Sequence, residues 1–166
     1  MMDILQIYNV SRETKEKIEA YKTLVLEWNC KFNLISKSSV EHIWERHILD
    51  SVQLYKYIRP TDKILLDLGS GAGFPGMVLA IMAEQLNPEL SINLVESIGK
   101  KTLFLNAVKN ELKLNVNILH DRIENIKMKN VDVITSRALA ALSKLLDYSK
   151  PCLLYTSPSP RDRQKS

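Results

Sequence analysis

The sequence predicts an α/β fold in which a mostly parallel β-sheet is flanked by helices and preceded by a helical extension. Residues 1–60 show apolar side chains at helical spacing, and from residue 61 short apolar runs alternate with helical stretches. Four of the five glycines lie between the first apolar run and the helix that follows it. Strands that alternate with helices form parallel sheets through right-handed crossovers.

Composition is consistent with one globular domain that has its own core. The chain has 166 residues, of which 45% are hydrophobic and 25% charged. No apolar run reaches the ~18–20 residues of a membrane-spanning helix, and residues 1–10 lack a signal-peptide pattern. Cys30 and Cys152 form no metal-ligand pattern. We therefore expect a cytoplasmic monomer with no metal and no membrane contact.

The net charge gives little information about a partner. Its value is +4, and residues 155–166 contribute +2 of it, from three basic residues against one acidic residue. Charge alone therefore does not indicate RNA.

The first predicted helices make up the extension, residues 1–60. Ser11 is suited to an N-cap, and a helical stripe then runs through Ile18, Tyr21, Val25 and Trp28. A break is predicted at residues 29–39. A second amphipathic stretch ends before Pro60 and contains Ile43, Trp44, Ile48, Val52 and Tyr55.

Residues 61–154 are predicted to form the core of the domain. Strands are expected at 63–68, 91–96, 115–120 and 131–135, and helices at 77–85, 101–112 and 139–148. Ligands of such sheets bind beyond the carboxyl ends of the strands. Residues 156–166 hold two prolines, three serines and four charges, and predict a disordered tail.

The glycine cluster is the most informative motif. Gly69, Gly71, Gly73 and Gly76 follow a predicted strand and precede a helix, a context in which such loops bind ligands. Glycine permits positive φ and lets a ligand approach the backbone. Asp67 at the strand end suits a ligand that carries an ammonium group, and this favours S-adenosylmethionine.

Two other interpretations of the loop remain open. The segment 71–76 also matches G-x-G-x-x-G, the dinucleotide fingerprint, although Phe74-Pro75 crowds the place where a pyrophosphate would lie. A tight turn without any ligand is the second alternative. Glu96 follows Gly73 by 23 residues, near the spacing expected of a carboxylate that binds ribose. A carboxylate at this position is compatible with either adenosine-containing cofactor. The alternative is that Glu96 is a solvated residue at the end of a strand.

Several further segments occur in a characteristic order. They are Trp28-Asn29 with Phe32-Asn33-Leu34, Arg46-His47-Ile48-Leu49-Asp50-Ser51, the glycine loop with Leu79-Ala80, Val95-Glu96-Ser97, Lys100-Lys101 with Phe104-Leu105, Arg122-Ile123-Glu124 and Ser136-Arg137-Ala138. Over residues 21–154 the chain thereby resembles the RsmG family, also called GidB. These bacterial methyltransferases modify N7 of a guanine in 16S ribosomal RNA.

The resemblance implies a Rossmann-like class I methyltransferase with S-adenosylmethionine as cofactor and 16S ribosomal RNA or the small ribosomal subunit as partner. It implies that Gly69 and Phe74 line the pocket, that Glu96 holds the ribose, and that Ile123 and Glu124 lie beside the adenine. Arg137 is expected at the same site. The expected cofactor-binding set is therefore Asp67, Gly69, Gly71, Gly73, Phe74, Glu96, Ile123, Glu124 and Arg137.

RNA-facing roles are expected for His47, Lys100, Lys101 and Arg137. Each has a structural alternative: His47 and Asp50 could form a packing or capping pair, the lysines could be solvated, and Arg137 could pair with a surface carboxylate. No general base is expected, because guanine N7 carries a free lone pair and the sulfonium is already activated. Alignment and electrostatics are then the main contributions of the protein. An NAD-dependent oxidoreductase and a non-catalytic RNA-binding module are the competing functions.

The C-terminus departs from the family. The family continues past Leu154 with further strand–helix–strand structure, and residues 155–166 resemble none of it. We therefore expect a truncated reading frame with an unrelated tail, missing C-terminal strands, and an exposed edge at residues 131–135.

This expectation predicts a chain of low stability and weak activity. Thermal unfolding with and without S-adenosylmethionine measures it, and a broad transition at low temperature is expected. A cooperative transition at high temperature would contradict the expectation.

Overall fold

The computed structural model describes residue 6 and residues 8–137 and 142–152. Its centre is a parallel sheet with the strand order β3-β2-β1-β4. The strands are β1 (Ile64–Leu68), β2 (Ser91–Val95), β3 (Val116–Leu119) and β4 (Val133–Ser136). Each predicted strand is present, and the predicted α/β fold is confirmed. The predicted tail, Ala138 and residues 139–141 of the last helix lie outside the described residues.

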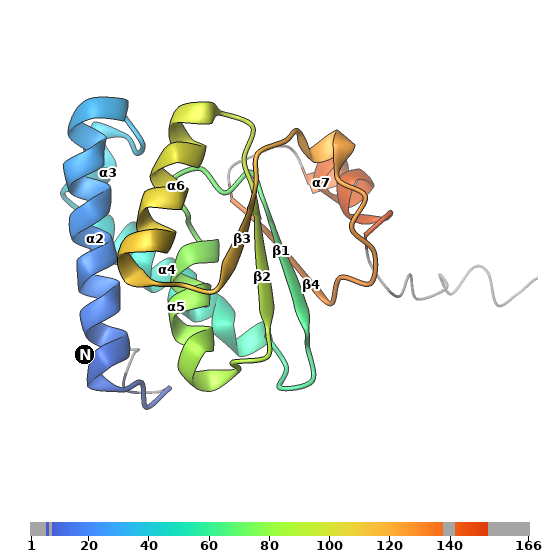
Figure 1. Ribbon diagram of the computed structural model, residues 1–166, viewed down its shortest axis with the longest axis horizontal. Coiled ribbons are helices and arrows are strands. Elements are labelled where there is room, and N and C mark those ends of the chain that lie inside the picture. The colour runs from blue at the N-terminus through green and yellow to red at the C-terminus, as the bar shows by residue number, and fades with distance from the viewer. Residues whose placement is uncertain (1–5, 7, 138–141, 153–166) are drawn as a thin grey trace, which may run out of the picture.

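Side chains of β1 are buried on both faces of the sheet, as expected of a central parallel strand. Leu65 faces a core shared with α5 (Gly76–Leu86) and α6 (Gly99–Leu112). Leu66 and Leu68 face a second core, which includes Val131 and Cys152 near α7 (Leu142–Ser149). Figure 1 shows the sheet between these two groups of helices.

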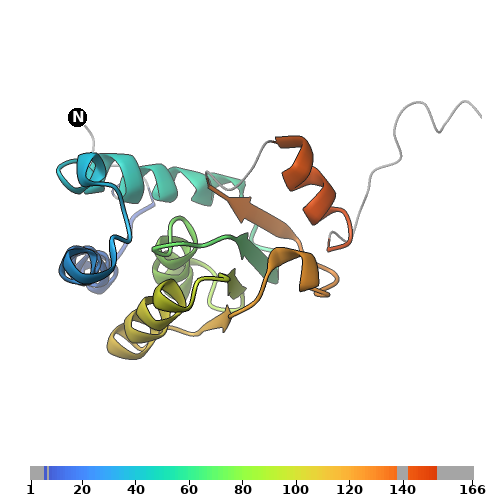
Figure 2. The same ribbon diagram turned by 90° about the horizontal axis from the view of Figure 1, so that it is seen from above.

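The long helix α2 (Arg12–Phe32) forms an additional outer layer. It packs against α5 and α6 rather than on the sheet itself (Figures 1 and 2). The Ser11 side chain caps it by accepting a hydrogen bond from the Thr14 N–H at 3.1 Å. The stripe residues Ile18, Tyr21 and Val25 are completely buried. Both the cap and the buried stripe were predicted.

The predicted break at residues 29–39 is wrong in its position. The helix continues through Phe32, whose ring lies 5.5 Å from that of Trp28, and it ends at Asn33, which has a φ of 49°. The Asn29 side chain accepts the Ile35 N–H at 2.8 Å and so fixes the exit of the chain. These local contacts outweigh the low helix propensity of asparagine.

The second part of the extension is a series of short helical segments. It consists of α3 (Lys37–Val40), the π-helical segment η1 (Trp44–Leu49), α4 (Asp50–Gln53) and the 3₁₀ turn η2 (Leu54–Tyr57). Together η1, α4 and η2 match the predicted amphipathic stretch that ends before Pro60. π-Helical turns concentrate at functional sites. In the described part of the chain, no helix is both long and apolar enough to cross a membrane.

A prediction concerns Gly76, at the start of α5. A Cβ at this position would lie 2.2 Å from Leu94 Cδ2 and 2.7 Å from Asp67 Oδ2. Gly76→Ala should therefore lower the free energy of unfolding by about 1–3 kcal/mol through overpacking, measured by urea denaturation.

Gly99→Ala is the matched control. A Cβ there would meet nothing closer than 3.8 Å, at the His120 ring. This variant should be as stable as the original chain or slightly more stable. Equal effects of the two substitutions would contradict the proposed packing at Gly76.

Candidate functional site

The glycine loop joins β1 to α5 at the carboxyl edge of the sheet. Gly69, Gly71 and Gly73 all have positive φ, which side chains other than glycine rarely adopt. A Cβ on Gly73 would lie 2.6 Å from Met77 Cγ and 2.8 Å from the Tyr21 hydroxyl. The backbone conformation of the loop therefore requires glycine, most strictly at Gly73.

Two side chains hold the loop from opposite sides. The buried Glu96, just past β2, accepts the Gly71 N–H at 2.8 Å with one carboxylate oxygen and the Ile98 N–H at 2.8 Å with the other. On the other side the Tyr21 hydroxyl donates to the Ala72 carbonyl at 2.6 Å. Burial raises the pKa of Tyr21 well above its usual value, so this hydroxyl remains a donor.

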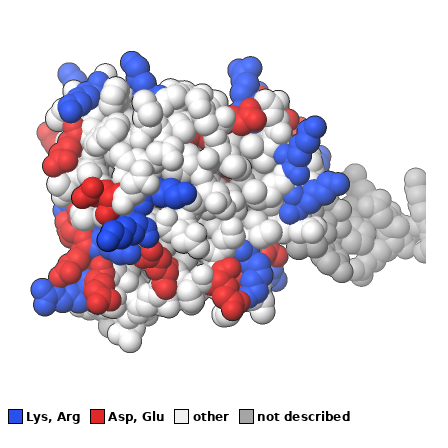
Figure 3. All heavy atoms as spheres, in the orientation of Figure 1, with Lys and Arg blue, Asp and Glu red and all other residues white. Residues whose placement is uncertain are grey.

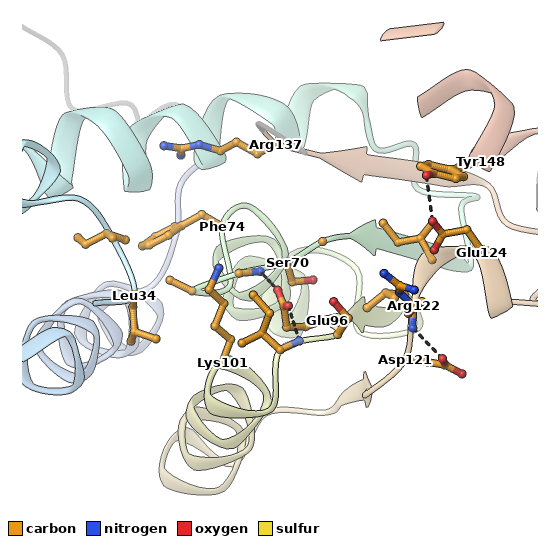
Figure 4. Close-up of a pocket in the computed structure, with 18 of the residues that line it drawn as sticks. Leu34, Ser70, Phe74, Glu96, Lys101, Asp121, Arg122, Glu124, Arg137 and Tyr148 are labelled. Atoms are coloured by element: carbon orange, nitrogen blue, oxygen red, sulfur yellow. Dashed lines mark hydrogen bonds between the residues drawn. The ribbon is translucent and has the colours of Figure 1, made fainter. Parts of the chain in front are cut away.

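A cavity of about 570 Å³ opens beside the loop, at the carboxyl ends of the strands (Figure 4). This volume is within the usual range of small-molecule sites. Its walls come from the loop, from the segments that follow β2, β3 and β4, from α7, and from the N-terminal extension. Its lining includes Leu34, His47, Gly69, Gly71, Phe74, Glu96, Lys101, Asp121, Arg122, Ile123, Glu124, Arg137, Lys144 and Tyr148.

One side of the cavity is built after β3. Ile123 and Glu124 begin the short turn η3 (Ile123–Asn125), and the Tyr148 hydroxyl of α7 donates to the Glu124 carboxylate at 3.1 Å. Figure 4 shows Tyr148 above Glu124 on this side. Both residues expected beside an adenine therefore line the cavity.

The opposite side contains a pair that the sequence did not predict. An Nη2–H of Arg137, just past β4, donates to His47 Nδ1 in η1 at 2.6 Å. The His47 ring also lies 4.8 Å from the Phe74 ring of the loop. Burial, and then the Arg137 charge, lower the pKa of His47 to about 4. The expected alternative, a capping pair with Asp50, is present only through the backbone, where the Asp50 N–H donates to the His47 carbonyl.

Most of the predicted site residues meet at this cavity. Those that line it are Gly69, Gly71, Phe74, Glu96, Ile123, Glu124, Arg137, His47 and Lys101. Asp67, Gly73 and Lys100 are not among the lining residues, and the cofactor contacts expected of Asp67 and Gly73 stay predictions. Lys100 is exposed at the start of α6, while Lys101 reaches into the cavity.

Alternation along β1 explains the position of Asp67. Its neighbours Leu66 and Leu68 face the α7 side, so the Asp67 side chain points to the α5 side, beneath Gly76. It is fully buried and accepts a hydrogen bond from the Thr135 hydroxyl at 2.7 Å. Asp67 therefore lies beneath the loop. Gly73 likewise faces inward, toward Tyr21.

Sequence reasoning missed the contributions of Tyr21, Leu34, Lys144 and Tyr148. Tyr21 is recognisable in the sequence only as a member of an apolar stripe, because its hydroxyl contact spans 51 residues. Tyr148 lies on a predicted helix, but the register of that helix against Glu124 depends on tertiary packing. No cluster of residues suited to a metal ion occurs in the described ranges.

Comparisons with known proteins agree with this geometry. The family GidB, described as rRNA small subunit methyltransferase G, matches residues 14–157. The ribosomal RNA small subunit methyltransferase G of Cereibacter sphaeroides is 47% identical over 150 residues, which cover 90% of this chain and 73% of the relative. The protein of the same name from Orientia tsutsugamushi is 45% identical over 149 residues, which cover 89% and 72%.

Solved structures share the fold at low sequence identity. M. jannaschii TYW2 in complex with AdoMet has a TM-score of 0.53 at 17% identity, covering 66% of this chain and 49% of that chain. Coclaurine N-methyltransferase bound to N-methylheliamine and SAH has a TM-score of 0.52 at 15% identity, covering 90% and 52%.

The parallel sheet, the glycine loop and the cavity at its carboxyl edge have the architecture of class I methyltransferases, the class that uses S-adenosylmethionine. Within that class, the match over residues 14–157 and the 47% identity show that the chain belongs to the GidB family, rRNA small subunit methyltransferase G. Membership in this family decides between the two cofactors that the glycine pattern left open.

A prediction follows from the burial of Asp67. Burial raises its pKa from 3.8 to about 6, against the opposing hydrogen bond from Thr135. Its contribution to stability is therefore complete below about pH 4 and is lost as the pH rises through about 6. Asp67→Asn should remove this loss. As the pH rises from about 4 to about 7, the free energy of unfolding of the variant should therefore increase by about 3 kcal/mol relative to that of the original chain.

Urea denaturation at several pH values measures that difference. The opposite pH effect of His47, whose depressed pKa costs stability as the pH falls below about 6.5, is present in both proteins and cancels. If the free energy of unfolding depended on pH in the same way in both proteins, the raised pKa of Asp67 would be contradicted.

Proposed function

We propose that this chain transfers a methyl group from S-adenosylmethionine to N7 of a guanine in 16S ribosomal RNA. Curated relatives that share up to 47% identity with it are named ribosomal RNA small subunit methyltransferase G. The substrate is the RNA of the small ribosomal subunit, and the chain acts on it in the cytoplasm as a monomer.

The cavity fits the cofactor that this reaction needs. Glu96 uses one lone pair of each carboxylate oxygen on a backbone N–H, so further lone pairs remain for the hydroxyls of a ribose. Ile123 and Glu124 would flank the adenine, and the backbone of Gly69 and Gly71 would approach the methionine part. S-adenosylmethionine supplies a methyl group on a sulfonium, which needs no further activation.

The protonation states of the side chains that line the cavity indicate which kind of substrate atom accepts the methyl group. His47 Nδ1 already accepts from Arg137, so its remaining nitrogen carries the proton and the ring cannot act as a base. Glu124 accepts from Tyr148, and Asp121 accepts from Arg122 and Asn125. The hydrogen bonds from Asn125 and the Arg122 N–H lower the pKa of Asp121, and those from its own backbone N–H and from Tyr148 lower the pKa of Glu124. A substrate nitrogen that carries no proton, such as guanine N7, needs no base and suits this site.

Charge around the cavity also suits a polyanion. Lys101, Arg122, Arg137 and Lys144 line it, while Glu96, Asp121 and Glu124 accept hydrogen bonds from protein donors. By contrast, the face shown in Figure 3 has basic and acidic side chains intermixed around its edge. The lining therefore carries one more basic than acidic side chain, and its acidic side chains already accept hydrogen bonds from the protein.

Methyl transfer from radiolabelled S-adenosylmethionine to 16S RNA that lacks the modification tests the proposal. Transfer is expected, with the label at guanine N7, where reduction and aniline treatment cleave the strand. Naked RNA and isolated small subunits are assayed in parallel to identify the preferred form.

Glu96→Ala is the matched variant. It removes the acceptor for the Gly71 N–H and the expected ribose ligand, so cofactor affinity should fall at least about tenfold. Absence of transfer to either RNA form, or label at an atom other than N7, would contradict the proposed function.

A further inference from the structure

Arg137 is held where the N-terminal extension meets the cavity. The backbone before it is fixed to β1, because the Ser136 hydroxyl donates to the Leu68 carbonyl at 3.1 Å. Figure 4 shows the Arg137 side chain reaching from the end of β4 along the helical segment that contains η1, above Phe74. There it donates to His47.

This contact fixes the state of the imidazole. An arginine remains charged and offers only donors, so His47 Nδ1 must be an acceptor and the proton must sit on Nε2. The pair therefore carries one net positive charge. His47 is 8% exposed, and its contact with the Phe74 ring ties the pair to the glycine loop.

Among the described residues, no carboxylate lies within 4 Å of the Arg137 guanidinium, although the Asp50 charge acts on His47 from nearby. Ion pairs involve Arg12 and Arg59 but not Arg137. Arg137 Nη1 and His47 Nε2 are both buried, and neither has a hydrogen-bond partner in the described part of the chain. A partly buried, uncompensated guanidinium is costly, and such sites are commonly functional.

The position of the pair indicates which anion it receives. Glu96 and Glu124 follow β2 and β3, whereas Arg137 follows β4, on the other side of the central strand β1. The pair therefore lies at the end of the cavity away from the residues suited to adenosine. That end is available to the nucleotide being modified.

We propose that His47 is a positioning residue for RNA: its neutral imidazole orients the Arg137 guanidinium so that it binds a backbone phosphate beside the target guanine. The inference rests on the proposed function. It changes the role of His47 from an RNA contact to the support of one.

Two substitutions separate positioning from packing. His47→Asn keeps an acceptor near the place of Nδ1, whereas His47→Phe keeps a ring against Phe74 without any acceptor. His47→Phe should raise KM for 16S RNA about tenfold, as expected for loss of a hydrogen bond to a charged group. Its kcat and its affinity for S-adenosylhomocysteine should change less than about twofold. His47→Asn should restore most of the loss.

Binding of RNA at several salt concentrations gives a readout that does not depend on catalysis. The salt slope is the slope of the logarithm of the RNA binding constant against the logarithm of the salt concentration. Loss of one phosphate contact lowers its magnitude by about one, and this is expected for Arg137→Gln and for His47→Phe. His42→Asn, at an exposed histidine of the same extension, is the control and should leave KM and slope unchanged.

The outcomes are distinguishable. An original chain that transfers no methyl group would refute the proposed function itself. Transfer with an unchanged KM and salt slope in His47→Phe would overturn the positioning role alone. Weakened binding of S-adenosylhomocysteine with unchanged RNA binding would also overturn it, and would assign the pair to the cofactor carboxylate. Equal losses in His47→Asn and His47→Phe would reduce His47 to packing.

Discussion

The site depends on how the glycine loop is held between Glu96 and Tyr21. A segment with three glycines at positive φ has a large conformational entropy when it is free, and ordering it is costly. The Glu96 carboxylate fixes the Gly71 N–H, and the Tyr21 hydroxyl fixes the Ala72 carbonyl. The loop therefore has its shape before any ligand arrives, and less of the binding free energy is spent on ordering it.

The same contacts make the N-terminal extension part of the site. Tyr21 comes from α2 and His47 from η1, and both contact Phe74 through their rings. Leu34 lines the cavity from the turn after α2. The extension thus covers α5 and α6 and also reaches the carboxyl edge of the sheet, where the loop and the end of β4 lie. The extension therefore contacts the loop directly through Tyr21 and His47.

Periodicity and the glycine cluster were sufficient to predict the strands, the main helices and the location of the cavity. They predicted Glu96 and Arg137 at strand ends because parallel strands end at one edge. They did not predict the side on which Asp67 lies, because the alternation of β1 places its carboxylate beneath Gly76. The pairing of His47 with Arg137 spans 90 residues, so no local pattern contains it. In the sequence, Tyr21 cannot be told from the other apolar residues of its helical stripe, because its hydroxyl bonds to a residue 51 positions away.

The affinity of a Tyr21→Phe variant for S-adenosylhomocysteine tests the central claim most directly. The substitution removes only the hydroxyl that fixes Ala72, and it leaves the ring, 5.2 Å from Phe74, in place. Isothermal titration should show about five- to tenfold weaker binding, the size of one buried hydrogen bond, while Tyr8→Phe, on the same extension, should bind normally. Unchanged affinity in Tyr21→Phe would contradict the claim that α2 preorganises the loop.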